Sequence, residues 1–199
     1  MRTSFPNRLG GCLIAAALML VPAARLAAQQ GAIELGIDSE MAYHILKGSG
    51  NDIFEMSLPL SSGDLPRAHN AFRVGFFASD RVSIEPSLSF GYLNPERTGY
   101  RWNLGLATVL QYHLVTDPSR LRPYLGLGAN VSVFHEYPGA DVGMTSSQFG
   151  VSGEFGLKIP LADRLGLRLA GGLGQFFKSK TFVNRTSVFG TLGVSYFTR

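Results

Sequence analysis

Thiols are almost absent from this chain of 199 residues, whose single cysteine is Cys12. One thiol excludes an internal disulfide framework and a metal site built from several cysteines. Charged residues are also few, at 16% of the chain, and tryptophan occurs once. No apolar run reaches the roughly 20 residues that a membrane-spanning helix needs. The sequence therefore excludes a disulfide-stapled domain and gives no support for a helical membrane protein.

The first 28 residues have the three-part plan of a secretory signal peptide. Arg2 and Arg8 form a basic start, Leu13–Val21 is a short apolar run, and small residues end at Ala28. We predict a cleaved signal peptide over residues 1–28 and one mature domain over residues 29–199, with an uncleaved anchor as the alternative.

Removal of this segment changes the charge argument. The whole chain has 18 basic and 14 acidic residues, and the predicted signal peptide contains Arg2, Arg8 and Arg25 but no acid. The mature domain then has 15 basic and 14 acidic residues, a net charge of +1. A net charge so close to zero gives no support for nucleic-acid binding. Cys12 is removed as well, which leaves the mature domain without a thiol.

Glycine and Phe are abundant, at 24 and 14 residues, and they occur within a two-residue alternation of polar and apolar positions. In the last segment Val188, Leu192 and Val194 share one face, and Ser187 and Ser195 share the other. A period of two predicts β-strands with unlike surroundings on their two faces. Eight such segments are present: Ala32–Ile45, Ala71–Ala78, Val82–Tyr92, Tyr100–Leu114, Arg122–Phe134, Gln148–Leu161, Arg164–Phe177 and Thr186–Arg199.

The connections between these segments alternate in length. Short turns around Asp80, Asp117 and Asp163 follow the second, fourth and sixth segments, whereas longer, more polar loops follow the others, the longest over Leu46–Asn70. A terminal strand with an unpaired edge is a liability, and pairing of the eighth segment with the first removes it. We predict an all-β fold, an eight-stranded antiparallel up-and-down barrel with both termini at the short-turn end.

Three features favour a transmembrane barrel, with its apolar face outward, over a secreted soluble barrel. A tilted strand needs about 9–11 residues to span a membrane, and most of these segments are longer. Their polar faces are rich in Gly and Ser, which suits a narrow interior. Aromatic residues also gather near the strand ends, as in interfacial girdles. Those near the long-loop end are Tyr43, Phe72, Phe90, Tyr92, Tyr100, Trp102 and Phe149, and those near the short turns are Tyr112 and Tyr196.

The residues RPYLGLG over Arg122–Gly128, LADRL over Leu161–Leu165 and the closing GVSYF over Gly193–Phe197 resemble the small outer-membrane β-barrels of the OmpA and OmpX type. The resemblance implies location in a bacterial outer membrane, contact with its lipid and lipopolysaccharide, and insertion by the outer-membrane assembly machinery. We expect a monomer. The chain departs from the family at its end, where Phe197 has inward parity and Thr198 and Arg199 follow it.

The predicted barrel interior holds charged and polar side chains of both signs. Opposite charges there should pair, because an isolated charge in a low-dielectric interior costs several kcal/mol. We expect a structural plug of ion pairs and hydrogen bonds, and the alternative is a narrow ion or proton path. The predicted cluster comprises Glu34, Asp38, Glu40, Arg73, Glu85, Arg101, Gln111, His113, Glu154, Lys158 and Arg168.

No catalytic or cofactor-binding motif stands out. None of His44, His69, His113 and His135 has a Ser and an acid at an obvious triad spacing, and the glycines alternate instead of forming a phosphate loop. We therefore expect a structural or surface-interaction barrel, with no catalysis, no cofactor, no metal and no nucleic-acid partner. The alternatives are a small pore, a lipid-acting outer-membrane enzyme and a secreted soluble barrel.

Overall fold

The computed structural model describes residues 33–47, 52–57, 72–93, 100–117, 121–137, 143–179 and 182–198. The predicted signal peptide lies outside these residues. No helix in the described part of the chain is long and apolar enough to cross a membrane. The described residues form nine strands of one antiparallel sheet. These are β1 (Ile33–Leu46), β2 (Ile53–Ser57), β3 (Phe72–Phe77), β4 (Val82–Leu93), β5 (Tyr100–His113), β6 (Arg122–Tyr137), β7 (Met144–Ala162), β8 (Leu165–Phe176) and β9 (Arg185–Phe197).

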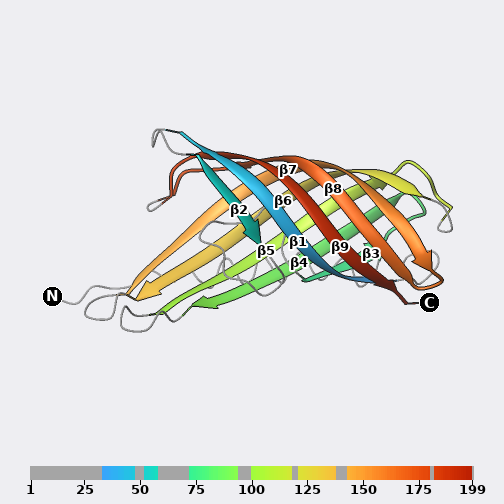
Figure 1. Cartoon of the computed structure of the whole chain (residues 1–199), viewed down its shortest axis with the longest axis horizontal. Coiled ribbons are helices and arrows are strands. Elements are labelled where there is room, and N and C mark those ends of the chain that lie inside the picture. Colours follow the sequence, from blue (N-terminus) through green and yellow to red (C-terminus); the bar gives the residue numbers. More distant parts are fainter. Residues whose placement is uncertain are drawn as a thin grey trace.

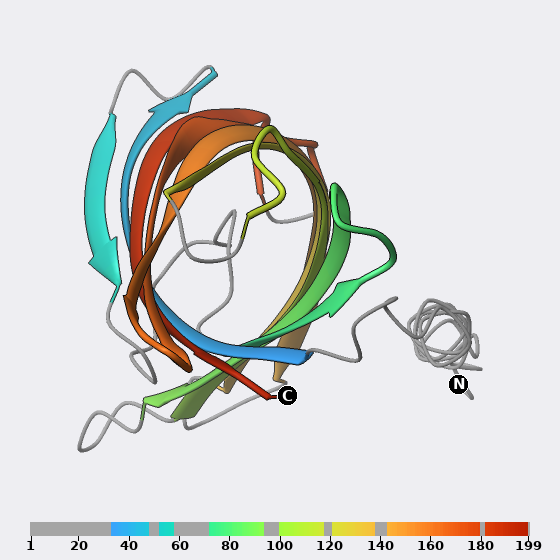
Figure 2. The same cartoon turned by 90° about the vertical axis from the view of Figure 1, so that its right-hand side faces the viewer.

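Eight of the strands close into a barrel. Strands β3 to β9 each pair with the next in chain order, β3 pairs with β1, and β9 returns to pair with β1 along its length. The closing register runs from Glu34 opposite Phe197 to Leu46 opposite Arg185. The strands cross the long axis at a tilt (Figure 1), and the view along that axis shows the ring (Figure 2). The predicted eight-stranded antiparallel barrel is confirmed.

The two faces of the wall differ as the alternation predicts. Leu127 on the outer face is 72% exposed, whereas Gln111 and Arg168 on the inner face are 0% and 1% exposed. Strand β1 alternates between exposed and buried positions over most of its length. Because successive side chains point to opposite faces of a strand, one register sorts the apolar residues outward and the polar residues inward.

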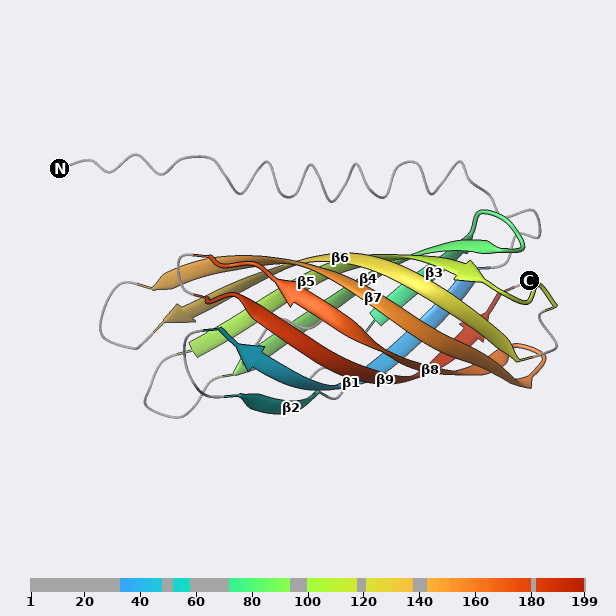
Figure 3. The same ribbon diagram turned by 90° about the horizontal axis from the view of Figure 1, so that it is seen from above.

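Strand β2 lies within the predicted loop Leu46–Asn70. It pairs with β1 from Glu40 opposite Ser57 to His44 opposite Ile53, on the edge that β3 uses nearer the start of β1. Phe54 is 68% exposed and follows the parity of Tyr43, its partner on β1. The alternation of β2 spans five residues, too few to stand out in the sequence. Figure 3 shows β2 beside β1.

Other strand boundaries also differ from the prediction. Strand β3 begins at Phe72, which pairs with Ile37 and Leu88. Both partners lie well inside their strands, so Phe72 is near the middle of the wall and outside the aromatic girdle predicted for it. Strands β6 and β7 extend past the predicted loop boundaries, to Tyr137 and from Met144, because their ladder continues to the pairing of Glu136 with Met144.

Candidate functional site

Eight buried polar side chains meet inside the half of the barrel nearer the short turns. They come from six different strands. Each strand can supply them because inward positions recur every second residue. Each is 6% exposed or less. We call this set the lumen network; its members are Glu34, Asp38, Arg73, Glu85, Gln111, Glu154, Lys158 and Arg168.

Arg73 joins three carboxylates and a hydroxyl. Its guanidinium forms an ion pair with Glu34, its Nε donates to Asp38 Oδ2 at 2.9 Å, and its Nη1 lies 3.5 Å from Glu85 Oε2. Its Nη2 donates to Ser195 Oγ at 2.6 Å. The fork of a guanidinium can serve several acceptors at once, and the site uses this property.

Arg168 and Lys158 carry the network across the bore. Arg168 Nη1 lies 3.2 Å from both Asp38 Oδ2 and Glu85 Oε2, and Nη2 lies 2.8 Å from Glu154 Oε1. Lys158 Nζ is 2.6 Å from Glu34 Oε2 and also pairs with Glu85. In the ring order, β8 stands opposite β4, so the contact between Arg168 and Glu85 joins diametrically opposed walls.

Hydrogen bonds complete the network. Gln111 Nε2 donates to Glu85 Oε2 at 2.9 Å, and Arg168 Nε donates to Tyr124 Oη at 2.7 Å. Four carboxylates then face three cations inside the bore, and Arg122 lies nearby with its guanidinium 5.2 Å from the Phe77 ring. Near-balance of charge is what an interior of low dielectric requires.

Inward glycines make room for these long side chains. A Cβ at Gly36 would lie 2.6 Å from the Arg73 guanidinium carbon, and a Cβ at Gly193 would overlap the Asp38 carboxylate. A Cβ at Gly126 would lie 2.6 Å from Glu154 Cγ. At these positions the absence of a glycine side chain leaves the room that the charged side chains occupy.

Two residues of the predicted cluster, Glu40 and Arg101, lie nearer the loop end than the lumen network. His113 joins the network through Ser83, whose Oγ donates to Gln111 Oε1 at 3.4 Å. His113 is bonded to Ser83, with Nε2 and Oγ 2.9 Å apart, at the short-turn side of Gln111. Glu40 is buried nearer the loop end. Arg101 was predicted in the interior cluster, but the structure places it at the loop-end rim, where its Nη2 lies 2.8 Å from Glu136 Oε1. This correction follows from position, since the second residue of β5 cannot reach the level of the network.

A second polar cluster occupies the loop end of the lumen. His44 Nδ1 is 2.7 Å from Ser187 Oγ, and His44 Nε2 is 3.6 Å from Glu55 Oε2. Arg185 interacts electrostatically with Glu55 and Glu40, and its guanidinium stacks 4.0 Å from the Phe176 ring centre. The order Ser, His, Glu is that of a hydrolytic triad. Ser187 and the His44 side chain are 1% and 2% exposed.

Sequence reasoning missed this second cluster for two reasons. His44 and Ser187 lie 143 residues apart and meet only across the closing seam of the barrel. Glu55 belongs to the short strand β2. Arg122 and Arg185 were also missed as interior residues, although each is the first residue of its strand and has the inward parity. Arg122 already stood at the start of a predicted segment, and extension of the last segment by one position would have included Arg185.

No group of His, Cys, Asp and Glu side chains suited to a metal ion occurs in the described ranges. Among those residues, the chemistry that the lumen offers is charge pairing, with a histidine, a serine and a carboxylate in contact nearer the loop end.

No protein-family model and no curated protein matches this sequence. Solved structures do match. The crystal structure of Neisserial surface protein A is similar with a TM-score of 0.57 and 16% identity, over 83% of this chain and 98% of that chain. Ail of Yersinia pestis, in complex with the heparin analogue sucrose octasulfate, is similar with a TM-score of 0.50 and 10% identity, over 84% of this chain and 98% of that chain.

At these identities the likeness concerns the fold alone. The structural matches and the closed ring of β1 and β3 to β9 confirm the resemblance noted in the sequence. The chain has the fold of the small eight-stranded outer-membrane β-barrels.

Proposed function

We propose that this chain is a bacterial outer-membrane barrel with a structural or surface-interaction role, whose lumen is plugged by polar side chains and which performs no catalysis. The observation that carries the proposal is the contact of Arg168 on β8 with Glu85 on β4, which spans the bore inside a wall whose outer face is apolar. Such a wall suits lipid, and such an interior suits a closed core.

The orientation in the membrane follows from the chain ends. The start of β1 and the end of β9 lie at the same end as the turns between β3 and β4 and between β7 and β8. A chain exported by a signal peptide and inserted from the periplasm keeps its termini and short turns there. The connections at the other end then face outward and are the surface for any partner.

Cell fractionation followed by gel electrophoresis of unheated and heated samples tests the location. We expect the full chain in the outer-membrane fraction, with faster migration before heating because the closed barrel stays compact in detergent. Recovery of a soluble protein would refute the membrane proposal.

The second candidate function is an acyl hydrolase, favoured only by the contacts of His44 with Ser187 and Glu55. Histidine bonded to a serine hydroxyl can act as its general base, and a carboxylate can orient the ring. Against this function stands the burial of Ser187, which leaves no approach for a substrate carbonyl.

A serine-reactive fluorophosphonate probe separates the two functions. We expect no labelling of the purified barrel. Labelling that Ser187→Ala abolishes and the matched lumen variant Ser152→Ala retains would replace the passive role with the hydrolase.

A further inference from the structure

Two turns at the short-turn end carry the same sequence unit. Each has Asp followed by Arg and then an apolar residue that begins the next strand: Asp80-Arg81-Val82 before β4, and Asp163-Arg164-Leu165 before β8. Both Asp and both Arg side chains are exposed. These turns lie at the end of the barrel that holds the Tyr girdle of the short-turn side.

In the first unit, Val82 pairs with Tyr112 on β5. Arg81 Nη1 donates to Tyr112 Oη at 3.3 Å, and the carbonyl of Arg81 accepts from the peptide N–H of His113 at 2.6 Å. The backbone of the arginine is thus joined to the strand that carries the tyrosine.

The second unit repeats this geometry on another pair of strands. Leu165 pairs with Tyr196 on β9, and Arg164 Nη1 donates to Tyr196 Oη, again at 3.3 Å. The carbonyl of Arg164 accepts from the peptide N–H of Phe197 at 2.9 Å. Backbone and side-chain contacts therefore both recur, and in each unit the arginine before the strand donates to the tyrosine hydroxyl of the neighbouring strand.

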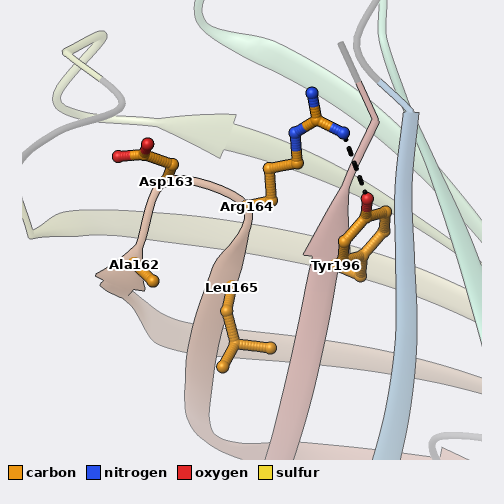
Figure 4. A pocket seen from close by; sticks show the side chains of 5 residues that line it. All are labelled: Ala162, Asp163, Arg164, Leu165 and Tyr196. Carbon is orange, nitrogen blue, oxygen red and sulfur yellow. Dashed lines mark hydrogen bonds between the residues drawn. The ribbon is translucent and has the colours of Figure 1, made fainter.

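The second unit borders a hollow of about 690 Å³. Figure 4 shows Arg164 and Tyr196 directed toward one another above Leu165. Asp163 lies in the same turn, one residue before Arg164. A register shift between Pro160 and Ala162 displaces the end of β7 beside it. The residues that line the hollow are Ala162, Asp163, Arg164, Leu165 and Tyr196.

These groups complement a phospholipid headgroup. A guanidinium has five N–H donors, of which the tyrosine takes one, and the rest match the oxygens of a phosphodiester. The Tyr196 hydroxyl accepts from Arg164 and keeps its own proton to donate. Leu165 and the tyrosine ring, 40% and 44% exposed on the outer face, offer apolar surface below the polar groups. Asp163 supplies a negative charge for an ammonium group.

We propose that each of the two units binds the zwitterionic phosphoethanolamine headgroup of a phospholipid in the leaflet that meets the short turns. Arg81 and Arg164 bind the phosphodiester, and Asp80 and Asp163 face the ammonium. The presence of both charges in each unit favours this headgroup over an anionic one that lacks the ammonium. The inference rests on the membrane location proposed above.

Native mass spectrometry of the full barrel, released from nanodiscs with equal amounts of phosphatidylethanolamine and phosphatidylglycerol, tests the sites. We expect up to two retained phosphatidylethanolamine molecules. Arg81→Gln and Arg164→Gln should each remove one, with about a tenfold loss of affinity, because a charge-assisted hydrogen-bonded contact is lost. Arg101→Gln, at the opposite rim, is the matched control and should retain both.

The aspartates test the identity of the headgroup. The double variant Asp80→Asn with Asp163→Asn should lose the preference for phosphatidylethanolamine and should bind phosphatidylglycerol as well. Equal binding of the two lipids by the unchanged barrel, or retention that neither arginine variant alters, would overturn the inference. Gel migration of unheated samples shows whether each variant is folded, so a barrel that inserts but retains no lipid refutes these sites and leaves the membrane proposal intact.

Discussion

Arg168 is the residue on which most of the buried carboxylates depend. It contacts Asp38, Glu85 and Glu154, and it is 1% exposed. Arg168→Met keeps much of the side-chain volume but leaves these carboxylates without their shared cation, which typically costs about 3–5 kcal/mol for a buried pair. Urea unfolding in lipid vesicles, followed by tryptophan fluorescence, measures the change.

The control for this variant is Arg101→Met. Arg101 pairs with Glu136 at the rim, where the two side chains are 39% and 49% exposed. An exposed ion pair contributes roughly 0–1 kcal/mol, so its removal should be nearly silent. Equal costs for the two variants would contradict the description of the lumen network as the stabilising one.

Glycine has a steric role at Gly193 that it lacks at Gly171. A Cβ at Gly193 would enter the space of the Asp38 carboxylate, whereas the nearest atom to a Cβ at Gly171 is a backbone oxygen at 3.6 Å. We expect Gly193→Ala to destabilise by about 1–3 kcal/mol through overpacking. Gly171→Ala should change stability little or raise it, because alanine restricts the unfolded chain. The same unfolding assay would refute this account if the two variants behaved alike.

At the scale of elements, β2 offers a test of pairing. Met41 and Met56 are register partners, and paired strands place such residues about 4.5–5.5 Å apart, within the Cα distances of a disulfide. The double variant Met41→Cys with Met56→Cys should form a disulfide on oxidation, seen as a gel shift. Met41→Cys with Ile53→Cys, which are out of register, should not. Cross-linking of the second pair alone would show that β2 has another register.

Depth along a strand should decide the cost of a charge on the outer face. Leu127 lies within β6, paired with Leu110 and Gly153, whereas Leu161 lies at the end of β7. An arginine on the lipid face costs about 2–4 kcal/mol near mid-membrane and about 0–1 near the interface. Leu127→Arg should therefore be far more destabilising than Leu161→Arg in vesicles. The reverse order would contradict the proposed membrane level.

Strand identity and facing could be predicted because both depend on local alternation, as in Val188, Leu192 and Val194 of β9. Pairs could not, because alternation carries no register: nothing near Arg168 indicates that Glu85, 83 residues away, is its partner. The five residues of β2 are too few for a clear period. His44 and Ser187 meet only once the ends of the barrel join. The sequence thus predicted which residues face inward but not the contacts they make.

At the scale of the whole molecule, the charged lumen favours the proposed plug over a pore. Lys158 and Arg168 each reach Glu85 on the far wall, so ion pairs cross the bore instead of lining it. An ion that passed this level would have to break several buried pairs, each desolvated and costly to separate. We expect no steady conductance from the purified barrel in a planar bilayer, and a steady open channel would overturn the plug.

A charge-neutral deletion sharpens this test. Glu85→Ala with Arg168→Ala truncates one side chain on each of two opposite walls, so it removes their contact across the bore without changing the net charge. Removal of both partners is less costly than removal of one, because it leaves less charge uncompensated. We expect ion conductance to appear in this variant and to remain absent in the rim control Arg101→Ala with Glu136→Ala. A silent double variant that still inserts and migrates as a folded barrel would show that other side chains close the bore.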